Sequence, residues 1–305
     1  MPDRPVAPLH GVLAPPLTPF EADGRVAEAL LIAHARHLLD AGCAGLVPFG
    51  TTSEAASLGL DERVDLLDRL VESGVPPERM IVGVGTTNLP DTVRLAAQAT
   101  RHGCAGVLLL PPFYYPSVSD DGLYSFAERF IAQVDALVGA PRLRIYLYHI
   151  PQVAGVGWSA NLVRRLRAAS PDHIVGIKDS TGDWANTQAL LGIDGLTVYP
   201  GTELLLPEAL AHGAPGCISA TANLNAHAIA ESIRLHDDDR NAFDACFDAV
   251  ARFRRTIQPY GAIPAQKALL ARQTGDARWR HVRPPLRPLS DDATEALANE
   301  LAAVS

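Results

Sequence analysis

Short apolar runs alternate with amphipathic segments along most of this chain. The runs are apolar throughout, which is typical of parallel strands whose outer face is covered by helices. They span Gly11–Phe20, Gly45–Gly50, Met80–Gly85, Gly106–Pro112, Arg144–Ile150, Ile174–Lys178, Thr197–Gly201 and Gly216–Thr221. Between them, apolar residues recur every three or four positions, as Val64, Leu67, Leu70 and Val71 do, and this is the period of a helix. Eight strand–helix units in succession predict an α/β protein, a closed (β/α)8 TIM barrel.

The pattern changes after Asn223, where only helical periodicity continues to the end of the sequence. Three of the earlier helices are predicted to end at a glycine, the residue that most often follows a helix in a left-handed conformation. These glycines are Gly42, Gly103 and Gly213. We therefore divide the chain into a barrel with the active site, residues 1–235, and a C-terminal helical extension, residues 236–305.

Composition narrows the class of protein. The 305 residues are 48% hydrophobic and carry a net charge of −8, which fits a sizeable core and argues against a basic face for nucleic acid. The apolar runs are far shorter than the ~20 residues of a membrane-spanning helix. Met1–Arg4 does not lead into an apolar signal core, so we expect a cytoplasmic protein. The cysteines are far apart and lie in apolar surroundings, and we expect reduced, buried thiols at Cys43, Cys104, Cys217 and Cys246.

Lys178 is the most unusual feature of the composition. The chain has 26 lysines and arginines together, yet Lys178 and Lys267 are its only lysines. Lys178 ends the apolar run Ile174–Lys178, where a buried strand is expected. Arginine keeps its proton in proteins, whereas a desolvated lysine can lose it and act as a nucleophile. The sequence thus indicates a functional amine, although a lysine at a strand end can also extend its ammonium to solvent.

Polar residues gather where the predicted strands end, and in such barrels this face carries the chemistry. The strand ends are Gly50–Glu54, Pro111–Tyr115, Tyr148–Pro151, Lys178–Ser180 and Ile218–Thr221. They bring together an amine, phenols and hydroxyls, without a set of metal ligands. These groups suit imine chemistry on a small 2-oxo acid. The amine would attack the ketone, hydroxyls and backbone N–H groups would bind the carboxylate, and a phenol would transfer protons.

Three of these segments also match motifs of a known family. Gly50–Glu54 matches the pattern G-[ST]-T-G-E except at Ser53, and Tyr148–Pro151 matches Y-N-x-P except at His149. Gly176–Thr181 matches G-x-K-[DE]-[AS]-[ST]. With these motifs in order on strands two, five and six, the chain resembles the dihydrodipicolinate synthase and N-acetylneuraminate lyase superfamily of pyruvate-dependent class I aldolases. The similarity covers nearly the whole chain.

The resemblance implies a role for each matched residue. Lys178 would form a Schiff base with the substrate, so that no separate cofactor is expected, and Tyr148 would be the proton shuttle. Gly50, Thr51 and Thr52 would contact the substrate carboxylate. Thr52 would also link Tyr148 to a second tyrosine.

In the family, this second tyrosine reaches across a dimer contact into the neighbouring site. Here it would be Tyr114, with Tyr115 as the alternative, and the resemblance therefore implies a homodimer or homotetramer. The backbone of Ile218 would contact the carboxylate or methyl end of the substrate, and Gly201 would keep the pocket open. Further candidate substrate-binding residues are Glu203 and His149, and His149 could equally serve only as a hydrogen-bond partner of the backbone.

Departures from the family patterns bear on the substrate. Val153 stands where dihydrodipicolinate synthases usually carry an arginine for the carboxylate of aspartate semialdehyde. Leu204 and Ala220 stand where sialate lyases carry part of the polar set that binds the sugar. The residues that remain at the predicted rim are His149, Glu203, Ser219, Val153 and Trp158. They favour a short 2-keto-3-deoxy or 4-hydroxy-2-oxo acid that is cleaved to, or formed from, pyruvate and an aldehyde.

Other functions compete with this prediction. Within the family, the chain could be a 4-hydroxy-tetrahydrodipicolinate synthase or a related 2-oxo acid dehydratase. A metal-dependent hydrolase would need more ligands at the strand ends than His149 and Asp179. A catalytically silent sensor would be expected to lose Lys178 or Tyr148, and both are present. The expected partners are pyruvate or another 2-oxo acid and an aldehyde, without nucleic acid or membrane.

Overall fold

Eight parallel strands form the centre of the protein, in a computed structural model that describes residues 7–139 and 143–304. The strands are β1 (Gly11–Ala14), β2 (Gly45–Leu46), β3 (Ile81–Gly83), β4 (Gly106–Leu109), β5 (Ile145–His149), β6 (Ile174–Asp179), β7 (Thr197–Pro200) and β8 (Gly216–Ile218). They are hydrogen-bonded in the orders β2–β1–β8 and β3–β4–β5–β6–β7. A parallel bridge from Leu46 to Met80 joins β2 to β3, and β7 lies beside β8, so the barrel closes. The predicted (β/α)8 barrel is confirmed.

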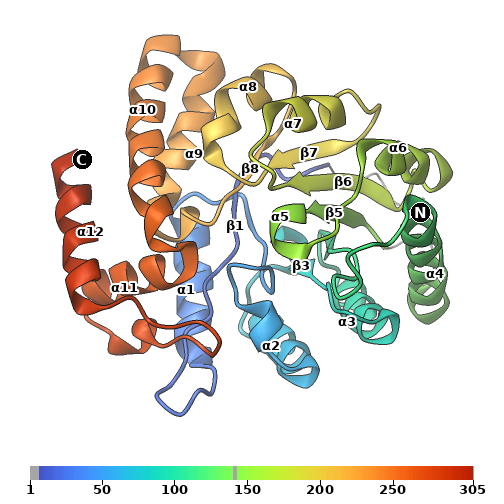
Figure 1. Ribbon diagram of the computed structural model, residues 1–305, viewed down its shortest axis with the longest axis horizontal. Helices are drawn as coiled ribbons and strands as arrows, with labels where there is room; N and C mark the ends of the chain where they lie inside the picture. The colour runs from blue at the N-terminus through green and yellow to red at the C-terminus, as the bar shows by residue number, and fades with distance from the viewer. Residues whose placement is uncertain (1–6, 140–142, 305) are drawn as a thin grey trace.

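Helices surround these strands (Figure 1). The barrel helices are α1 (Glu28–Asp40), α2 (Leu60–Glu72), α3 (Leu89–Arg101), α4 (Asp120–Val138), α6 (Ala160–Ala169), α7 (Trp184–Leu191), α8 (Leu206–Ala211) and α9 (Ala222–Asp238). One additional helical turn, α5 (Pro151–Ala154), follows β5. The residues Met1–Arg4, on which the expected location rests, lie outside the part of the chain that the structure describes.

Local sequence signals fix where these helices begin and end. At the start of α3, the side chain of Asn88 accepts a hydrogen bond from the backbone N–H of Asp91 at 2.9 Å, which satisfies a free donor of the first turn. The predicted terminal glycines are confirmed, because Gly42, Gly103 and Gly213 have φ angles of 101°, 74° and 88°. A left-handed residue at these positions turns the chain from each helix into the next strand.

Aromatic side chains fill the interior of the barrel. Tyr146 on β5 and Tyr199 on β7 are buried, with ring centroids 6.0 Å apart. Gly176 on β6 makes room for Tyr146, because a Cβ atom there would lie 2.5 Å from the Tyr146 ring. The barrel is therefore a packed core below the carboxyl ends of its strands.

The C-terminal extension consists of α10 (Arg240–Ile257), α11 (Ala262–Thr274) and α12 (Asp291–Val304), with the short helix η5 (Ala277–Arg280) between α11 and α12. It lies on one side of the barrel, with α10 along α9 (Figure 1). Its own small core contains Ile257, Ala265, Leu269, Leu297 and Leu301. A second cluster, Leu17, Leu270 and Trp279, joins it to the segment after β1. The proposed domain boundary at residue 235 falls inside α9 and stays a prediction.

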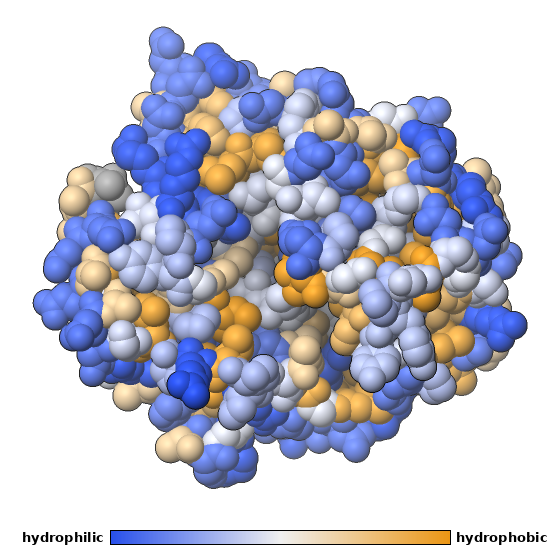
Figure 2. All heavy atoms as spheres, in the orientation of Figure 1, coloured by the Kyte–Doolittle hydropathy of each residue, from blue (hydrophilic) through white to orange (hydrophobic). Residues whose placement is uncertain are grey.

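The surface and the cysteines agree in part with expectation. Figure 2 shows polar and charged residues over most of one face, with apolar residues in smaller groups between them.

All four cysteines are free; Cys43 and Cys217 are buried, whereas Cys104 and Cys246 are only half-buried. Burial raises the pKa of each thiol, so that all four stay protonated near neutral pH. Among the described helices, none has the length and apolar character that would let it cross a bilayer.

A buried histidine joins α1 to α9. The imidazole Nε2 of His34 lies 2.8 Å from Oδ1 of Asn223, and its ring packs edge-on against Trp279. Asn223 in turn donates to the backbone carbonyls of Pro15 and Ala220. Burial lowers the pKa of His34 to about 4, because a charged imidazolium there would lose its hydration.

This histidine predicts a stability that depends on pH. The folded state holds the His34 proton less tightly than the unfolded chain, whose imidazole has a pKa near 6.5. Stability is therefore fully present above pH 6.5 and falls as the pH drops toward 4. Urea unfolding at pH 7 and 4.5 should show a loss about 2 kcal/mol larger for the natural protein than for His34→Gln. Equal losses in the two proteins would contradict the assignment.

Candidate active site

Lys178 and Tyr148 lie side by side at the carboxyl ends of two neighbouring strands. In the parallel register of β5 and β6, Tyr148 pairs with Lys178, and residues paired in this way point to the same face of the sheet. Both side chains are buried, with exposed fractions of 4% and 5%. The Lys178 Nζ atom lies 4.5 Å from the centre of the Tyr148 ring. The predicted amine and phenol are thus adjacent, in a place with little water.

A turn after β2 brings a hydroxyl group to this pair. The Oγ1 atom of Thr51 lies 3.2 Å from the phenol oxygen of Tyr148. Thr51 is exposed, so this hydrogen bond connects the buried phenol to the open end of the barrel. The arrangement gives a proton a path between the phenol and solvent, through groups that can both donate and accept.

The sequence prediction for the threonines needs a correction. It made Thr52 the partner of Tyr148, but the hydrogen bond comes from Thr51, and Thr52 is buried. The winding of the turn decides this. Glu54 has a φ of 56°, a left-handed conformation that costs a non-glycine residue roughly 1–2 kcal/mol, and its N–H donates to the Thr51 carbonyl at 3.0 Å. Ser53, in the place of the family's glycine, donates to the Pro16 carbonyl at 2.6 Å.

Tyr114 and Tyr115 lie in the loop between β4 and α4 and project to solvent. Their exposed fractions are 74% and 66%, and their rings are in edge-to-face contact at 5.5 Å. In this single chain neither ring is packed into the core. The prediction that one of them completes the site of a neighbouring subunit stays a prediction, and the exposure of both leaves Tyr115 as open as Tyr114.

His149 does not lie with the catalytic pair, contrary to its assignment as a substrate-binding residue. Successive strand residues point to opposite faces, so His149 faces outward from the barrel while Tyr148 faces inward. Its Nδ1 accepts the backbone N–H of Trp158 at 2.9 Å. Burial lowers the pKa of His149, and the nearby Asp179 opposes this shift. The alternative of a hydrogen bond to the backbone is the correct one, and it requires a neutral imidazole.

Glu203 and its neighbours are also engaged by the protein itself. The carboxylate of Glu203 is fully buried and accepts hydrogen bonds from the hydroxyls of Ser219 and Thr221. Arg254 on α10 lies 3.7 Å away from it. The predicted role of Glu203 and Ser219 in substrate binding is therefore wrong for the site as it stands. Trp158 is also absent from the rim, because it is fully buried and donates to the Leu109 carbonyl.

The remaining predicted residues occupy the strand ends as expected, but their roles stay predictions. Ile218 is fully buried on β8. Gly50 precedes the threonines, and a Cβ atom there would meet little, its nearest neighbour being 3.9 Å away. At Gly201 a Cβ atom would lie 2.0 Å from the Ser180 hydroxyl. The structure therefore explains the glycine at position 201 by the space that Ser180 needs, a local contact. Its predicted role of keeping the pocket open stays a prediction.

Sequence reasoning missed one buried group beside the site. Lys267, from α11 of the extension, forms an ion pair with Glu54 in the turn that carries Thr51, and both side chains are fully buried. The signal that singled out Lys178, a lysine in a chain that otherwise uses arginine, applies equally to Lys267. Arginine is larger and forked, so a buried slot for one ammonium group does not accept it.

The protein is a closed barrel, and a buried amine, a phenol and a hydroxyl lie together at the carboxyl ends of its strands. Enzymes with this fold carry their active sites at that end. The sequence model of the dihydrodipicolinate synthetase family matches residues 8–304 of this chain. The chain belongs to this family, and it is an enzyme of the lyase class, as the sequence resemblance implied.

Individual relatives also cover nearly the whole chain. A protein of Chloroflexus aurantiacus, named as an uncharacterized DapA-like lyase, is 33% identical over 293 residues, or 94% of either chain. The 4-hydroxy-tetrahydrodipicolinate synthase of Mycolicibacterium paratuberculosis is 33% identical over 310 residues, or 98% of this chain and 96% of that protein. The crystal structure of dihydrodipicolinate synthase from Agrobacterium tumefaciens has a TM-score of 0.85 at 32% identity. It covers 97% of this chain and 99% of that one.

Proposed function

We propose that this enzyme is a pyruvate-dependent class I aldolase in which Lys178 forms an imine with a 2-oxo acid. The adjacency of Lys178 and Tyr148 carries this proposal, because imine formation and carbon–carbon bond chemistry need an amine and a proton carrier at the same carbon centre. The free amine adds to the ketone carbon, and water leaves as the imine forms. The imine then withdraws electrons from the neighbouring carbon.

The phenol of Tyr148 supplies the proton transfers in this proposal. In the cleavage direction, it removes the proton of the 4-hydroxyl group, the bond between C3 and C4 breaks, and an aldehyde leaves. The electrons of that bond form an enamine on the Lys178 adduct, which takes a proton at C3 and is hydrolysed to pyruvate and free amine. Thr51, bonded to the phenol, exchanges the proton with the open end of the barrel.

The residues around the mouth bear on the second half of the substrate. Val153 on α5 is 65% exposed and stands where the family's dihydrodipicolinate synthases usually carry an arginine. A second carboxylate would find methyl groups there instead of a bidentate cation. This favours a 2-keto-3-deoxy or 4-hydroxy-2-oxo acid with an uncharged far end. Because His149, Glu203 and Trp158 form hydrogen bonds with other groups of the protein, this preference rests mainly on Val153.

A second candidate function has specific support. The Mycolicibacterium and Agrobacterium proteins are both named as synthases of the dihydrodipicolinate type, and each is about one-third identical to this chain over nearly its full length. The chain could therefore condense pyruvate with aspartate semialdehyde, provided that another group replaces the arginine missing at Val153. A 2-oxo acid dehydratase would use the same imine.

Borohydride trapping and a substrate panel test the proposal. Sodium borohydride with pyruvate should add a pyruvyl group to the peptide that contains Lys178. A coupled pyruvate-release assay over 2-keto-3-deoxy and 4-hydroxy-2-oxo acids should then find a substrate that is cleaved. If pyruvate and aspartate semialdehyde instead react with kcat/KM of about 10⁴ M⁻¹s⁻¹ or more, within the normal enzymatic range, the synthase is the correct function. Failure to trap any adduct would exclude both.

A further inference from the structure

The second lysine of the chain is also buried, at a place that the reaction does not occupy. Nζ of Lys267 forms the ion pair with Glu54, donates to the His281 carbonyl at 2.7 Å and lies 4.4 Å from the centre of the Phe20 ring. Burial lowers the pKa of Lys267 to about 8, and the Glu54 carboxylate opposes that shift. Lys267 is therefore a cation that stays charged near neutral pH with the help of Glu54.

Glu54 is the residue that shapes the catalytic turn. Its backbone holds the left-handed conformation and donates to the Thr51 carbonyl. Its carboxylate is held at both oxygens, one by Lys267 and the other by the backbone N–H of Arg283 at 3.1 Å. A conformation that is unfavourable by itself persists when such contacts determine it. The two contacts to Glu54 come from the C-terminal extension, more than 200 residues along the chain.

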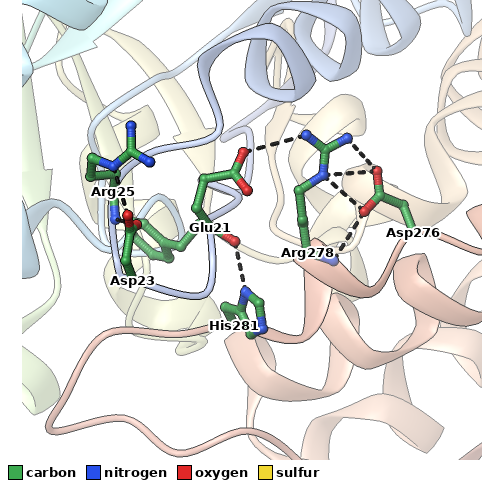
Figure 3. A network of polar contacts seen from close by, with 7 residues as sticks. Glu21, Asp23, Arg25, Asp276, Arg278 and His281 are labelled. Atoms are coloured by element: carbon green, nitrogen blue, oxygen red, sulfur yellow. Dashed lines mark hydrogen bonds and ion pairs between the residues drawn. The ribbon is translucent and has the colours of Figure 1, made fainter.

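The segment that carries these contacts is itself fastened to the barrel. Figure 3 shows Arg278 between Asp276 and Glu21, and His281 directed at the segment after β1. Nδ1 of His281 lies 2.8 Å from the Phe20 carbonyl oxygen. The Arg283 guanidinium forms an ion pair with Glu62 at the start of α2 and donates to the carbonyls of Gly24 and Ser57. Residues 276–283 thus form a brace between the extension and the loops on either side of the turn.

We propose that Lys267 is a positioning residue of the active site: through Glu54 it holds the turn that presents the Thr51 hydroxyl to the Tyr148 phenol. This rests on the proposed function, in which the phenol transfers protons. Lys267 touches neither the substrate nor the phenol, and its effect passes through one side chain and one backbone hydrogen bond. Loss of the ion pair should release Glu54 from the left-handed conformation and move Thr51 away from Tyr148.

The test separates proton transfer from imine formation. In D2O, the enamine step exchanges the methyl protons of pyruvate for deuterium without an aldehyde, and proton NMR follows the rate. Borohydride trapping reports the imine at Lys178 independently. The variant is Glu54→Gln with Lys267→Met, which removes both charges together, because a single lost partner would leave a buried charge unpaired. Circular dichroism and thermal unfolding verify that it is folded.

The double variant should trap pyruvate at Lys178 to the same extent as the natural enzyme and exchange the methyl protons about 10- to 100-fold more slowly, as expected for a misplaced catalytic group. Adding the double change to Thr51→Val should slow exchange no further, because both act on the same hydroxyl. Arg280→Ala is the matched control. Arg280 lies in the same segment, and the variant breaks only its exposed ion pair with Asp291 at the start of α12. Surface ion pairs contribute little, so exchange should stay within about twofold of the natural rate.

Exchange at the natural rate in the folded double variant would overturn the proposal, and so would a full extra loss on top of Thr51→Val. If the double variant does not fold, Lys267→Met alone replaces it; this variant removes the ammonium group that holds Glu54, and an unchanged exchange rate in the folded protein would again overturn the proposal. A natural enzyme that traps no pyruvate is a different outcome. It would exclude the proposed function itself, and the positioning role with it.

Discussion

Replacing Lys178 by arginine should lower kcat by a factor on the order of 10⁴ or more, as the loss of a catalytic nucleophile does in other enzymes. A guanidinium group keeps its proton in a protein, so it cannot add to a ketone. The variant should still fold, because Lys178 lies near the carboxyl end of β6 at the barrel mouth, where the larger cation can stack on the Tyr148 ring as the ammonium does. Turnover is measured by pyruvate release, and the fold by circular dichroism.

Lys267 provides the internal control for this result. It is the only other lysine of the chain and is equally buried, so burial by itself does not distinguish the two amines. Only Lys178 lies beside the phenol at the strand ends. A pyruvyl adduct found on Lys267, or substantial turnover by Lys178→Arg, would remove Lys178 from the role of nucleophile.

Tyr148→Phe should lower kcat by about 10²- to 10⁴-fold, the usual cost of losing one positioned proton carrier. Phenylalanine keeps the ring beneath the Lys178 ammonium and removes only the hydroxyl that Thr51 contacts. Imine trapping should therefore persist while exchange and turnover fall. A loss smaller than about tenfold, well below that range, would show that Tyr148 is not the proton carrier.

The two threonines offer a comparison within this prediction. Thr51→Val removes the hydroxyl bonded to the phenol and should act mainly on kcat. Thr52→Val alters a buried residue that is predicted to bind the carboxylate and should act mainly on KM. Removing binding that is equal in the ground and transition states raises KM without changing kcat. The opposite division would restore the assignment of Thr52 as the partner of Tyr148.

The barrel and the catalytic pair were accessible from the sequence because both depend on short-range pattern. Each apolar run formed a strand, although most runs were predicted too long at their carboxyl ends, where residues such as Pro48 and Gly50 belong to loops. Because β5 and β6 are parallel neighbours, Tyr148 and Lys178 are adjacent once they occupy paired positions in the strand register. The same alternation along a strand also requires His149 to face away from Tyr148, so this error could have been avoided.

Other features of the site depend on contacts between distant parts of the chain. The local sequence does not show which hydroxyl turns to Tyr148, since the conformation of the turn depends on distant partners: Pro16 accepts from Ser53, and Lys267 binds Glu54. From the sequence, Glu203 is predicted to be a polar residue of the rim. In the structure it lies beside Arg254, which comes from a helix of the extension. Burial decides such cases, and local sequence does not show it.

The burial of both lysines has a practical consequence. The described chain presents no exposed ε-amino group, because Lys178 and Lys267 are 5% and 0% exposed. Amine-directed reagents, which usually decorate enzyme surfaces at random when proteins are labelled or fixed to a support, have no surface lysine to modify here. We expect small aldehydes and active esters that fit into the barrel mouth to react with Lys178 instead. Among its lysines, the folded enzyme thus offers only the active-site amine to such probes.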